Sequence, residues 1–249
     1  MSASRNELPQ IVALGGHNLT TGDEDVALSR YILTQVPAER PRICFLSQGS
    51  GEDAFYVANF YRHFLALNAL PSDLSLFMPH TADIAGFLLE HDIIHVGGGN
   101  TKSMLALWRE WGVDRMLRQA WEQGTLLSGV SAGAICWFEQ GLTDSIPGKF
   151  SALNCLGFVP GSCSPHFDGE SGRRPTCHRL IAGGEMADGF GIDDGAALHF
   201  AGAGPPRVVS SRAGATAYRV ERTPAGACES TLNASVLLRL EGNGGQLTI

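Results

Sequence analysis

The chain has 249 residues, 44% apolar and 17% charged, so it can bury a substantial core, unlike an intrinsically disordered protein. Its net charge of −7 and its lack of lysine or arginine runs argue against nucleic acid as a ligand. No stretch approaches the roughly 18 apolar residues of a membrane span, and the N-terminus has no signal-peptide pattern. We therefore expect a cytoplasmic protein without a membrane partner.

In the first half of the chain, short β-rich segments alternate with longer segments of helical periodicity, and several of the β-rich segments end in glycine. Strands are expected at residues 10–16, 42–46, 74–78, 92–96 and 125–130. Helices are expected from about residue 21 onward and at residues 56–67, 81–90, 103–123 (with a break near Gly112) and 132–138. This alternation is typical of a mostly parallel sheet flanked by helices. We predict an α/β fold in a single domain that spans residues 1–249.

The second half of the chain has a different pattern. Beyond Gly141 the residues are rich in glycine, proline and serine, and we interpret this part as loops. Further strands are expected at residues 189–192, 196–200, 207–210, 217–220 and 235–240. Short strands in close succession indicate an antiparallel C-terminal extension of the sheet.

The segment Gly129-Val-Ser-Ala-Gly133 places Ser131 after an apolar strand and before a helical pattern. A serine in this context sits on a sharp turn that exposes its hydroxyl at the carboxyl end of the sheet. The five-residue pattern is weak by itself, and a strand-to-helix turn with a capping serine is the structural alternative. With its context, the segment predicts that Ser131 is the nucleophile of a serine hydrolase.

A serine nucleophile needs a base within hydrogen-bond reach. We favour His166, which lies in the loop-like segment Ser164-Pro-His-Phe-Asp168 after the nucleophile. The other candidate histidines are His17, His95, His178 and His199. His95 and His199 fall within expected strands, whereas His17 follows a strand-terminal Gly-Gly and could line the same crevice.

The base in turn needs a carboxylate that orients it. The candidates are Asp193 and Asp194 in Gly191-Ile-Asp-Asp-Gly195, and Asp144 in Leu142-Thr-Asp-Ser145. Both segments also read as ordinary turns. We favour Asp194, with Asp144 as the alternative third member. The resulting order of serine, histidine and aspartate differs from the serine, aspartate, histidine order of ordinary α/β-hydrolases.

Stabilisation of a tetrahedral oxyanion requires backbone N–H groups aimed at one point. Ala132, the residue after the nucleophile, supplies one such group. The run Gly97-Gly-Gly99 can supply another, from Gly98 or Gly99. This run lacks the lysine and spacing of a nucleotide-binding loop, and no metal-ligand spacing is apparent. We expect neither a cofactor nor a metal.

Four segments together resemble the peptidase E family, the S51 serine peptidases that include aspartyl dipeptidase and cyanophycinase. They are Val96-Gly-Gly-Gly-Asn-Thr101, Gly129-Val-Ser-Ala-Gly-Ala134, Ser164-Pro-His-Phe-Asp168 and Gly191-Ile-Asp-Asp-Gly195. Their order and spacing are far more specific than any one of them. The branch that the chain looks most like is the aspartyl dipeptidase branch.

The resemblance implies a class I glutamine amidotransferase-like (flavodoxin-like) fold, with serine in place of the cysteine nucleophile of those enzymes. It also implies hydrolysis of a peptide bond next to an N-terminal aspartate. On this mapping Ser131 attacks and His166 is the base, Gly98, Gly99 or both join Ala132 in the oxyanion hole, and Asn100 lines the pocket.

The resemblance leaves the third member of the triad and the substrate open. Aspartyl dipeptidase has a glutamate in the segment that reads Ile192-Asp-Asp-Gly195 here, so Asp194 must lie closer to His166 or leave the role to Asp144. An aspartyl side chain needs a cation, and Arg173 and Arg174 lie just beyond His166. A solvated loop pair is the alternative interpretation of these arginines.

Three functions therefore stay under consideration. The first is a dipeptidase that takes a small peptide with N-terminal aspartate. The second is a related S51 activity, either an exopeptidase for other small peptides or a cyanophycinase-like activity on β-aspartyl-arginine. The third is a non-catalytic small-ligand-binding member of the same fold. A homodimer is compatible with each of them.

Overall fold

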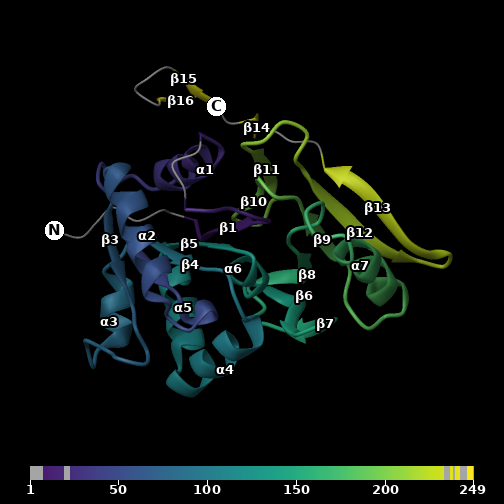
Figure 1. Ribbon diagram of the computed structural model, residues 1–249, viewed down its shortest axis with the longest axis horizontal. Coiled ribbons are helices and arrows are strands. Elements are labelled where there is room, and N and C mark those ends of the chain that lie inside the picture. Colours follow the sequence, from purple (N-terminus) through teal and green to yellow (C-terminus); the bar gives the residue numbers. More distant parts are fainter. Residues whose placement is uncertain (1–7, 20–22, 233–235, 238, 242–245, 249) are drawn as a thin grey trace.

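The computed structural model describes residues 8–19, 23–232, 236–237, 239–241 and 246–248. These residues form an eight-stranded sheet, a six-stranded sheet and a two-stranded ribbon, with helices packed against the two larger sheets (Figure 1). The helices are α1 (Asp23–Thr34), α2 (Ala54–Ala66), α3 (Ile84–Leu89), α4 (Thr101–Trp111), α5 (Val113–Glu122), α6 (Ala132–Ile135) and α7 (Arg173–Ala182), with a short 3-10 turn at Gln48–Ser50.

The strands follow one another along the chain and divide between the three sheets. They are β1 (Gln10–Leu14), β2 (Arg42–Leu46), β3 (Leu70–Asp73), β4 (Ile93–Val96), β5 (Leu126–Val130), β6 (Phe138–Ile146), β7 (Lys149–Asn154), β8 (Val159–Ser164), β9 (Gly189–Ile192), β10 (Ala196–Ala201), β11 (Arg207–Ser210), β12 (Ala217–Thr223), β13 (Gly226–Leu232), β14 (Val236–Leu237), β15 (Arg239–Glu241) and β16 (Gln246–Thr248).

The eight-stranded sheet has the order β14-β11-β10-β1-β5-β4-β2-β3. Its strands β1, β5, β4, β2 and β3 run parallel, whereas β10 pairs antiparallel with both β1 and β11. Strand β5 lies between β1 and β4, in the interior of the sheet. The carboxyl ends of parallel strands meet at one edge of a sheet, and ligands bind there in open α/β folds.

Helices cover both faces of this sheet, and the strand residues alternate between them. In β1, Ile11 and Ala13 belong to the core cluster under α3, α4 and α5, whereas Val12 and Leu14 belong to the cluster under α1 and α2. This alternation follows from the two-residue period of a β-strand. Because both faces are buried, the inner strands β1, β4 and β5 are mostly apolar.

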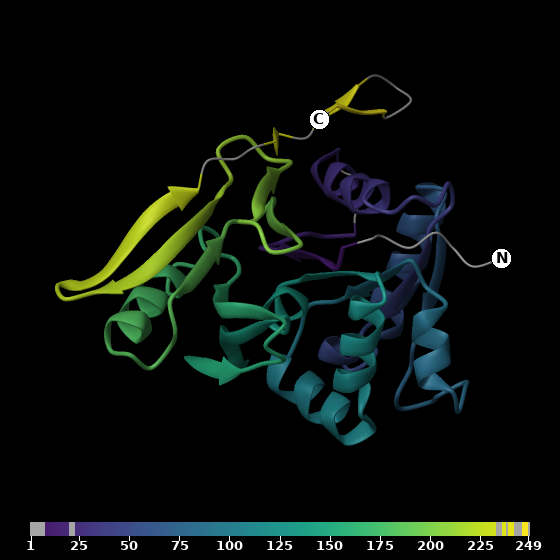
Figure 2. The same cartoon turned by 180° about the vertical axis from the view of Figure 1, so that it is seen from behind.

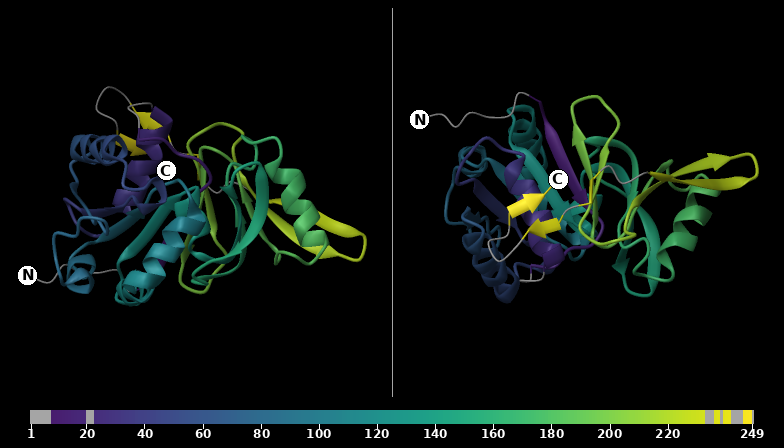
Figure 3. Two further views of the ribbon diagram at one scale, coloured as in Figure 1. Left: turned by 60° about the horizontal axis from the view of Figure 1, so that its bottom comes forward. Right: turned by 90° about the horizontal axis from the view of Figure 1, so that it is seen from above.

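The six-stranded sheet has the order β13-β12-β9-β8-β6-β7 and contains both parallel and antiparallel pairs. Helix α7 packs against it through a cluster that includes Phe167, Leu180 and Val220. Figure 2 shows the β12–β13 hairpin extending beyond α7, and Figure 3 shows these elements at the opposite end of the molecule from α2 and α3. The loop that carries His166 joins β8 of this sheet to α7.

The predicted α/β class, with a sheet flanked by helices, is confirmed, but several expected elements are wrong. The strand expected at residues 74–78 lies instead at β3, where Pro71 is tolerated because β3 is the last strand at its edge of the sheet. The helix expected at residues 132–138 ends at Ile135, and β6 begins at Phe138. Of the strand expected at residues 235–240, positions 235 and 238 lie outside the described residues.

The loops expected beyond Gly141 are also wrong. This part contains β6, β7 and β8 and helix α7, and strand β8 pairs in parallel with β6 and β9. The expected antiparallel extension is present, because β10 pairs antiparallel with β1 and β11, and β12 pairs antiparallel with β9 and β13. Arg173 and Arg174, expected in a loop, are the first residues of α7. This helix is hard to predict from the sequence, because glycine and proline are typical of loops and occur at Gly172, Pro175 and Gly183. Proline is nevertheless compatible with a first helical turn. Among the described residues, no helix is long and apolar enough to cross a membrane.

Candidate active site

Strand β5 delivers Ser131 at the carboxyl edge of the eight-stranded sheet. Ser131 has φ 56° and ψ −112°, a backbone conformation that residues other than glycine rarely adopt. A side chain at Gly129 would overlap the Gly133 carbonyl, and one at Gly133 would overlap the Val96 carbonyl. The two glycines therefore allow the strained turn, which is the geometry of a nucleophile elbow.

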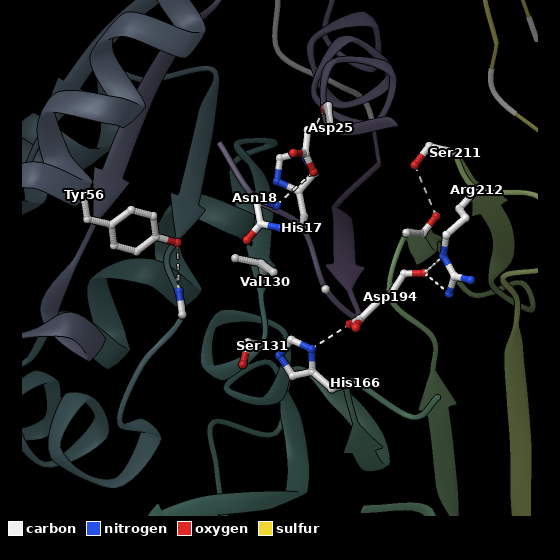
Figure 4. Close-up of a pocket in the computed structure, with 13 residues that line it drawn as sticks. His17, Asn18, Asp25, Tyr56, Val130, Ser131, His166, Asp194, Ser211 and Arg212 are labelled. Atoms are coloured by element: carbon white, nitrogen blue, oxygen red, sulfur yellow. Dashed lines mark hydrogen bonds and ion pairs between the residues drawn. The ribbon is translucent and has the colours of Figure 1, made fainter. Parts of the chain in front are cut away.

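His166 and Asp194 come from two loops that meet next to Ser131. The Nδ1 atom of His166 lies 2.6 Å from Oδ1 of Asp194. Figure 4 shows the other ring nitrogen of His166 on the side of Ser131. Because a carboxylate can only accept, Nδ1 carries the proton and the other nitrogen is left to act as a base.

The environment of Asp194 keeps its carboxyl ionised. The hydrogen bond with His166 lowers the pKa of Asp194, against the opposing effect of partial burial, and the charge of Arg212 acts in the same direction as the hydrogen bond. A lowered pKa means that Asp194 loses its charge only as the pH falls below the ordinary range of a carboxyl group. Asp194 is therefore anionic at neutral pH.

Ser131, His166 and Asp194 line one pocket with a volume of about 450 Å³. Its lining residues come from loops at the carboxyl ends of β1, β4, β5, β8, β9 and β11 and from helices α1 and α2. They are Gly16, His17, Asn18, Asp25, Tyr56, Gly98, Val130, Ser131, His166, Asp194, Gly195, Ser211 and Arg212. The size suits a short peptide rather than a folded protein.

Gly98 and Ala132 flank Ser131. A Cβ atom at Gly98 would lie 3.5 Å from Cβ and 4.0 Å from Oγ of Ser131, so the backbone of Gly98 passes close to the hydroxyl. The N–H of Gly98 donates to the Tyr56 hydroxyl at 3.2 Å. Ala132 begins α6, where backbone N–H groups have no partner within the helix. Gly99 has φ 132° and lies against Gly49, where a side chain would overlap the backbone.

Asn100 and Asp144 do not line this pocket. The side chain of Asn100 caps α4 by accepting from the Ser103 N–H at 3.0 Å, and it donates to the Ser145 carbonyl at 2.9 Å. The side chain of Asp144 is 61% exposed, and its Oδ1 lies 3.8 Å from Nη2 of Arg173. The structure therefore brings Asp194, and not Asp144, into contact with His166.

The two arginines also lie outside the pocket lining. Arg173 is buried, and it donates to Glu170 at 2.8 Å and to the Leu142 carbonyl at 2.9 Å. Arg174 forms an ion pair with Glu229 of β13 and stacks on Tyr218. Both guanidinium groups thus hold α7 to its neighbours, and neither is positioned to meet a substrate beside Ser131.

Two of the other candidate histidines are buried and neutral. His95 bonds the Ser128 hydroxyl at 2.9 Å, and burial lowers its pKa to about 3. His199 bonds Tyr31, and burial lowers its pKa to about 4. His178 pairs with Glu229, whereas His17 lines the pocket and bonds the Asp25 carbonyl at 2.9 Å. Among the described residues, no cluster of three His, Cys, Asp or Glu side chains could hold a metal ion.

The pocket includes residues that the sequence interpretation did not select. Tyr56 reaches it from α2, Asp25 from α1, and Arg212 from the loop between β11 and β12. Asp168 is not part of the pocket lining, but it forms an ion pair with Arg212, which is. Asp168 belongs to the segment Ser164-Pro-His-Phe-Asp168, which carries part of the family resemblance, whereas Tyr56 and Arg212 belong to segments without any motif.

Gly16 offers a test of the contact between His166 and Asp194. A Cβ atom at residue 16 would overlap Oδ1 of Asp194 and lie 3.0 Å from Nδ1 of His166. We expect Gly16→Ala to lower kcat by about 100-fold, because small displacements of catalytic groups are costly. Steady-state kinetics and Tm would check this. Gly204→Ala is the matched control, since its Cβ meets nothing within 4 Å. Equal activity of both variants would contradict the prediction.

Comparison with known proteins identifies the family. Residues 11–205 match peptidase family S51. The chain belongs to peptidase family S51. It is 49% identical over 213 residues to the uncharacterized peptidase YgaJ of Bacillus subtilis (strain 168). The aligned region covers 86% of this chain and 92% of YgaJ. The predicted family and the serine-type peptidase class are thus confirmed.

Solved structures share the fold over most of the chain. A crystal structure of a peptidase from an acI-B1 Actinobacterium superposes with a TM-score of 0.67 at 16% identity, over 92% of this chain and 95% of the other. A putative peptidase E protein from Listeria monocytogenes EGD-e superposes with a TM-score of 0.60 at 16% identity, over 91% of this chain and 100% of the other. At this identity the similarity concerns the fold alone.

Proposed function

We propose that this S51 peptidase hydrolyses short peptides through a triad of Ser131, His166 and Asp194 and a covalent acyl-enzyme. The observation that carries the proposal is the 2.6 Å contact between His166 and Asp194 in the pocket that also exposes Ser131. The backbone of Gly98 and the N–H of Ala132, both next to Ser131, support it further.

In this mechanism, Oγ of Ser131 attacks the peptide carbonyl while the free ring nitrogen of His166 takes its proton. Asp194 holds the opposite N–H and stabilises the imidazolium. The developing oxyanion accepts from the N–H of Ala132 and from a second donor at Gly98 or Tyr56. His166 then gives its proton to the leaving amine. A water molecule, activated by His166 in the same way, hydrolyses the acyl-enzyme and restores Ser131.

For the substrate, we propose dipeptides with N-terminal aspartate. The family resemblance supports this class, and the pocket of about 450 Å³ has the size for a short peptide. The test is a panel of Asp-X, Asn-X and X-Asp dipeptides with identification of the products. Cleavage of Asp-X with kcat/KM well above that of Asn-X is expected. Cleavage of other dipeptides without Asp-X would refute the aspartyl assignment but leave the triad standing.

A second candidate substrate is supported by the acidic residues of the pocket. Asp25 and Asp194 both line it, and such carboxylates favour a substrate that carries positive charge. A cyanophycinase-like activity on β-aspartyl-arginine fits this environment. Including β-aspartyl-arginine and β-aspartyl-leucine in the same panel separates the two candidates, because only a preference for the arginine compound supports the second.

A further inference from the structure

An ion pair outside the triad holds the backbone of Asp194. The N–H of Asp194 donates to Oδ1 of Asp168 at 2.9 Å. The carbonyl of Asp194 accepts from Nε of Arg212 at 3.0 Å and from Nη2 at 2.7 Å. Nη2 of Arg212 also contacts Oδ2 of Asp168. Both polar groups of the Asp194 backbone are therefore bound to one pair of opposite charges, as the bonds from Arg212 in Figure 4 show in part.

The pair joins three segments that are distant in the sequence. Asp168 lies two residues after His166, Asp194 lies between β9 and β10, and Arg212 lies between β11 and β12. Arg212 is itself fixed, because its carbonyl accepts from the Ser210 hydroxyl at 2.7 Å. The loop that bears the base and the turn that bears its carboxylate are thus tied to each other by charge-assisted hydrogen bonds, which are stronger than neutral ones.

Within the part of the chain that the structure describes, the carboxylate of Asp194 has no hydrogen-bond partner other than His166. Its side chain is 42% exposed, and residues 16 and 169, which flank the carboxylate, are glycines that leave it room. A side chain with this freedom reaches His166 in one geometry only if its backbone is held. A partly exposed ion pair such as that of Asp168 and Arg212 contributes little to the stability of the fold. Its main effect is therefore on the position of Asp194.

We propose that Asp168 and Arg212 form a clasp that positions Asp194 against His166, and that Arg212 serves hydrolysis of every substrate rather than recognition of acidic ones alone. The inference rests on the proposed triad. Asp168 and Arg212 are positioning residues: they act through Asp194 and do not touch the reacting atoms.

The test compares Asp168→Asn, Arg212→Met and Arg212→Lys with the wild type. We expect Asp168→Asn and Arg212→Met to lower kcat about 10- to 100-fold on acidic and neutral dipeptides alike, with KM changed less than about 3-fold. Arg212→Lys is expected to recover part of the loss. The double variant Asp168→Asn with Arg212→Met is expected to be no worse than the more impaired single variant, because both remove one device. Arg179→Met is the control, since Arg179 pairs with Glu185 on the surface.

A second measurement needs no substrate and so separates failure of the clasp from failure of the proposed function. The proton that His166 shares with Asp194 is expected to give a downfield NMR resonance, assigned by its loss in His166→Gln. We expect this resonance to disappear or move in Asp168→Asn while Tm stays near the wild-type value. Its absence from the wild type, or its persistence in Asp168→Asn together with unchanged kcat, would overturn the inference. A rise of KM confined to acidic peptides in Arg212→Met would overturn it as well.

Discussion

Ser131→Ala is expected to lower peptide hydrolysis by about 10⁴-fold or more, because in the proposed mechanism the hydroxyl oxygen forms the acyl-enzyme. The variant should fold normally. The turn depends on the close packing of Gly129 against the Gly133 carbonyl and of Gly133 against the Val96 carbonyl, and the Ser131 hydroxyl takes part in neither contact. Alanine at φ 56° keeps the backbone strain of the wild type without adding to it. Steady-state kinetics with the best substrate of the panel measures the effect.

Labelling with a fluorophosphonate probe extends this prediction to the class of function. The probe phosphonylates an activated serine oxygen with loss of fluoride, so the wild type should carry one adduct on Ser131 and Ser131→Ala none. Ser230→Ala, a change of an exposed serine on β13, should be labelled like the wild type. Failure of several such probes to label the wild type would favour a protein that binds a small ligand without hydrolysing it.

The parallel part of the fold is readable from the sequence because each of its inner strands is a short apolar run. Strand β4, for example, consists of four fully buried residues followed by glycines. Strand β3 is not predicted, because Pro71, Ser72 and Asp73 are typical of a turn. Its pairing with β2 at the sheet edge makes this segment a strand. Propensity decides little at such a position, since tertiary contacts decide the strand.

The candidate active site also contains some residues that the sequence predicts and others that it does not. Ser131, His166 and Asp194 each belong to a local pattern whose glycines or turn residues reveal an unusual backbone. Arg212 has no such pattern, and it contacts Asp168 although the two residues are 44 positions apart in the sequence. Tyr56 likewise reaches Gly98 from 42 residues away. Such contacts depend on how the loops of two sheets come together, and no short window of sequence contains that information.

Asp194→Asn and Asp144→Asn test the third member of the triad. Asparagine at residue 194 would present either an N–H to the Nδ1–H of His166 or a neutral carbonyl, so His166 would lose its anionic partner and the tautomer that leaves a base toward Ser131. We expect kcat to fall by about 10² to 10⁴-fold, with little change in KM. Asp144→Asn should change kcat less than about 3-fold, because the exposed Asp144 has only the long contact to Arg173 to lose.

The pH dependence distinguishes a lost carboxylate from a general loss of structure. In the wild type, the contribution of ionised Asp194 persists at neutral pH and disappears only as the pH falls through its lowered pKa. Asp194→Asn has no such group, so its residual activity should lack that step on the acid side, whereas Asp144→Asn should keep it. A larger loss for Asp144→Asn than for Asp194→Asn would mean that the 2.6 Å contact with His166 is not the catalytic one. Asp144 would then have to leave Arg173 and approach His166 when substrate binds.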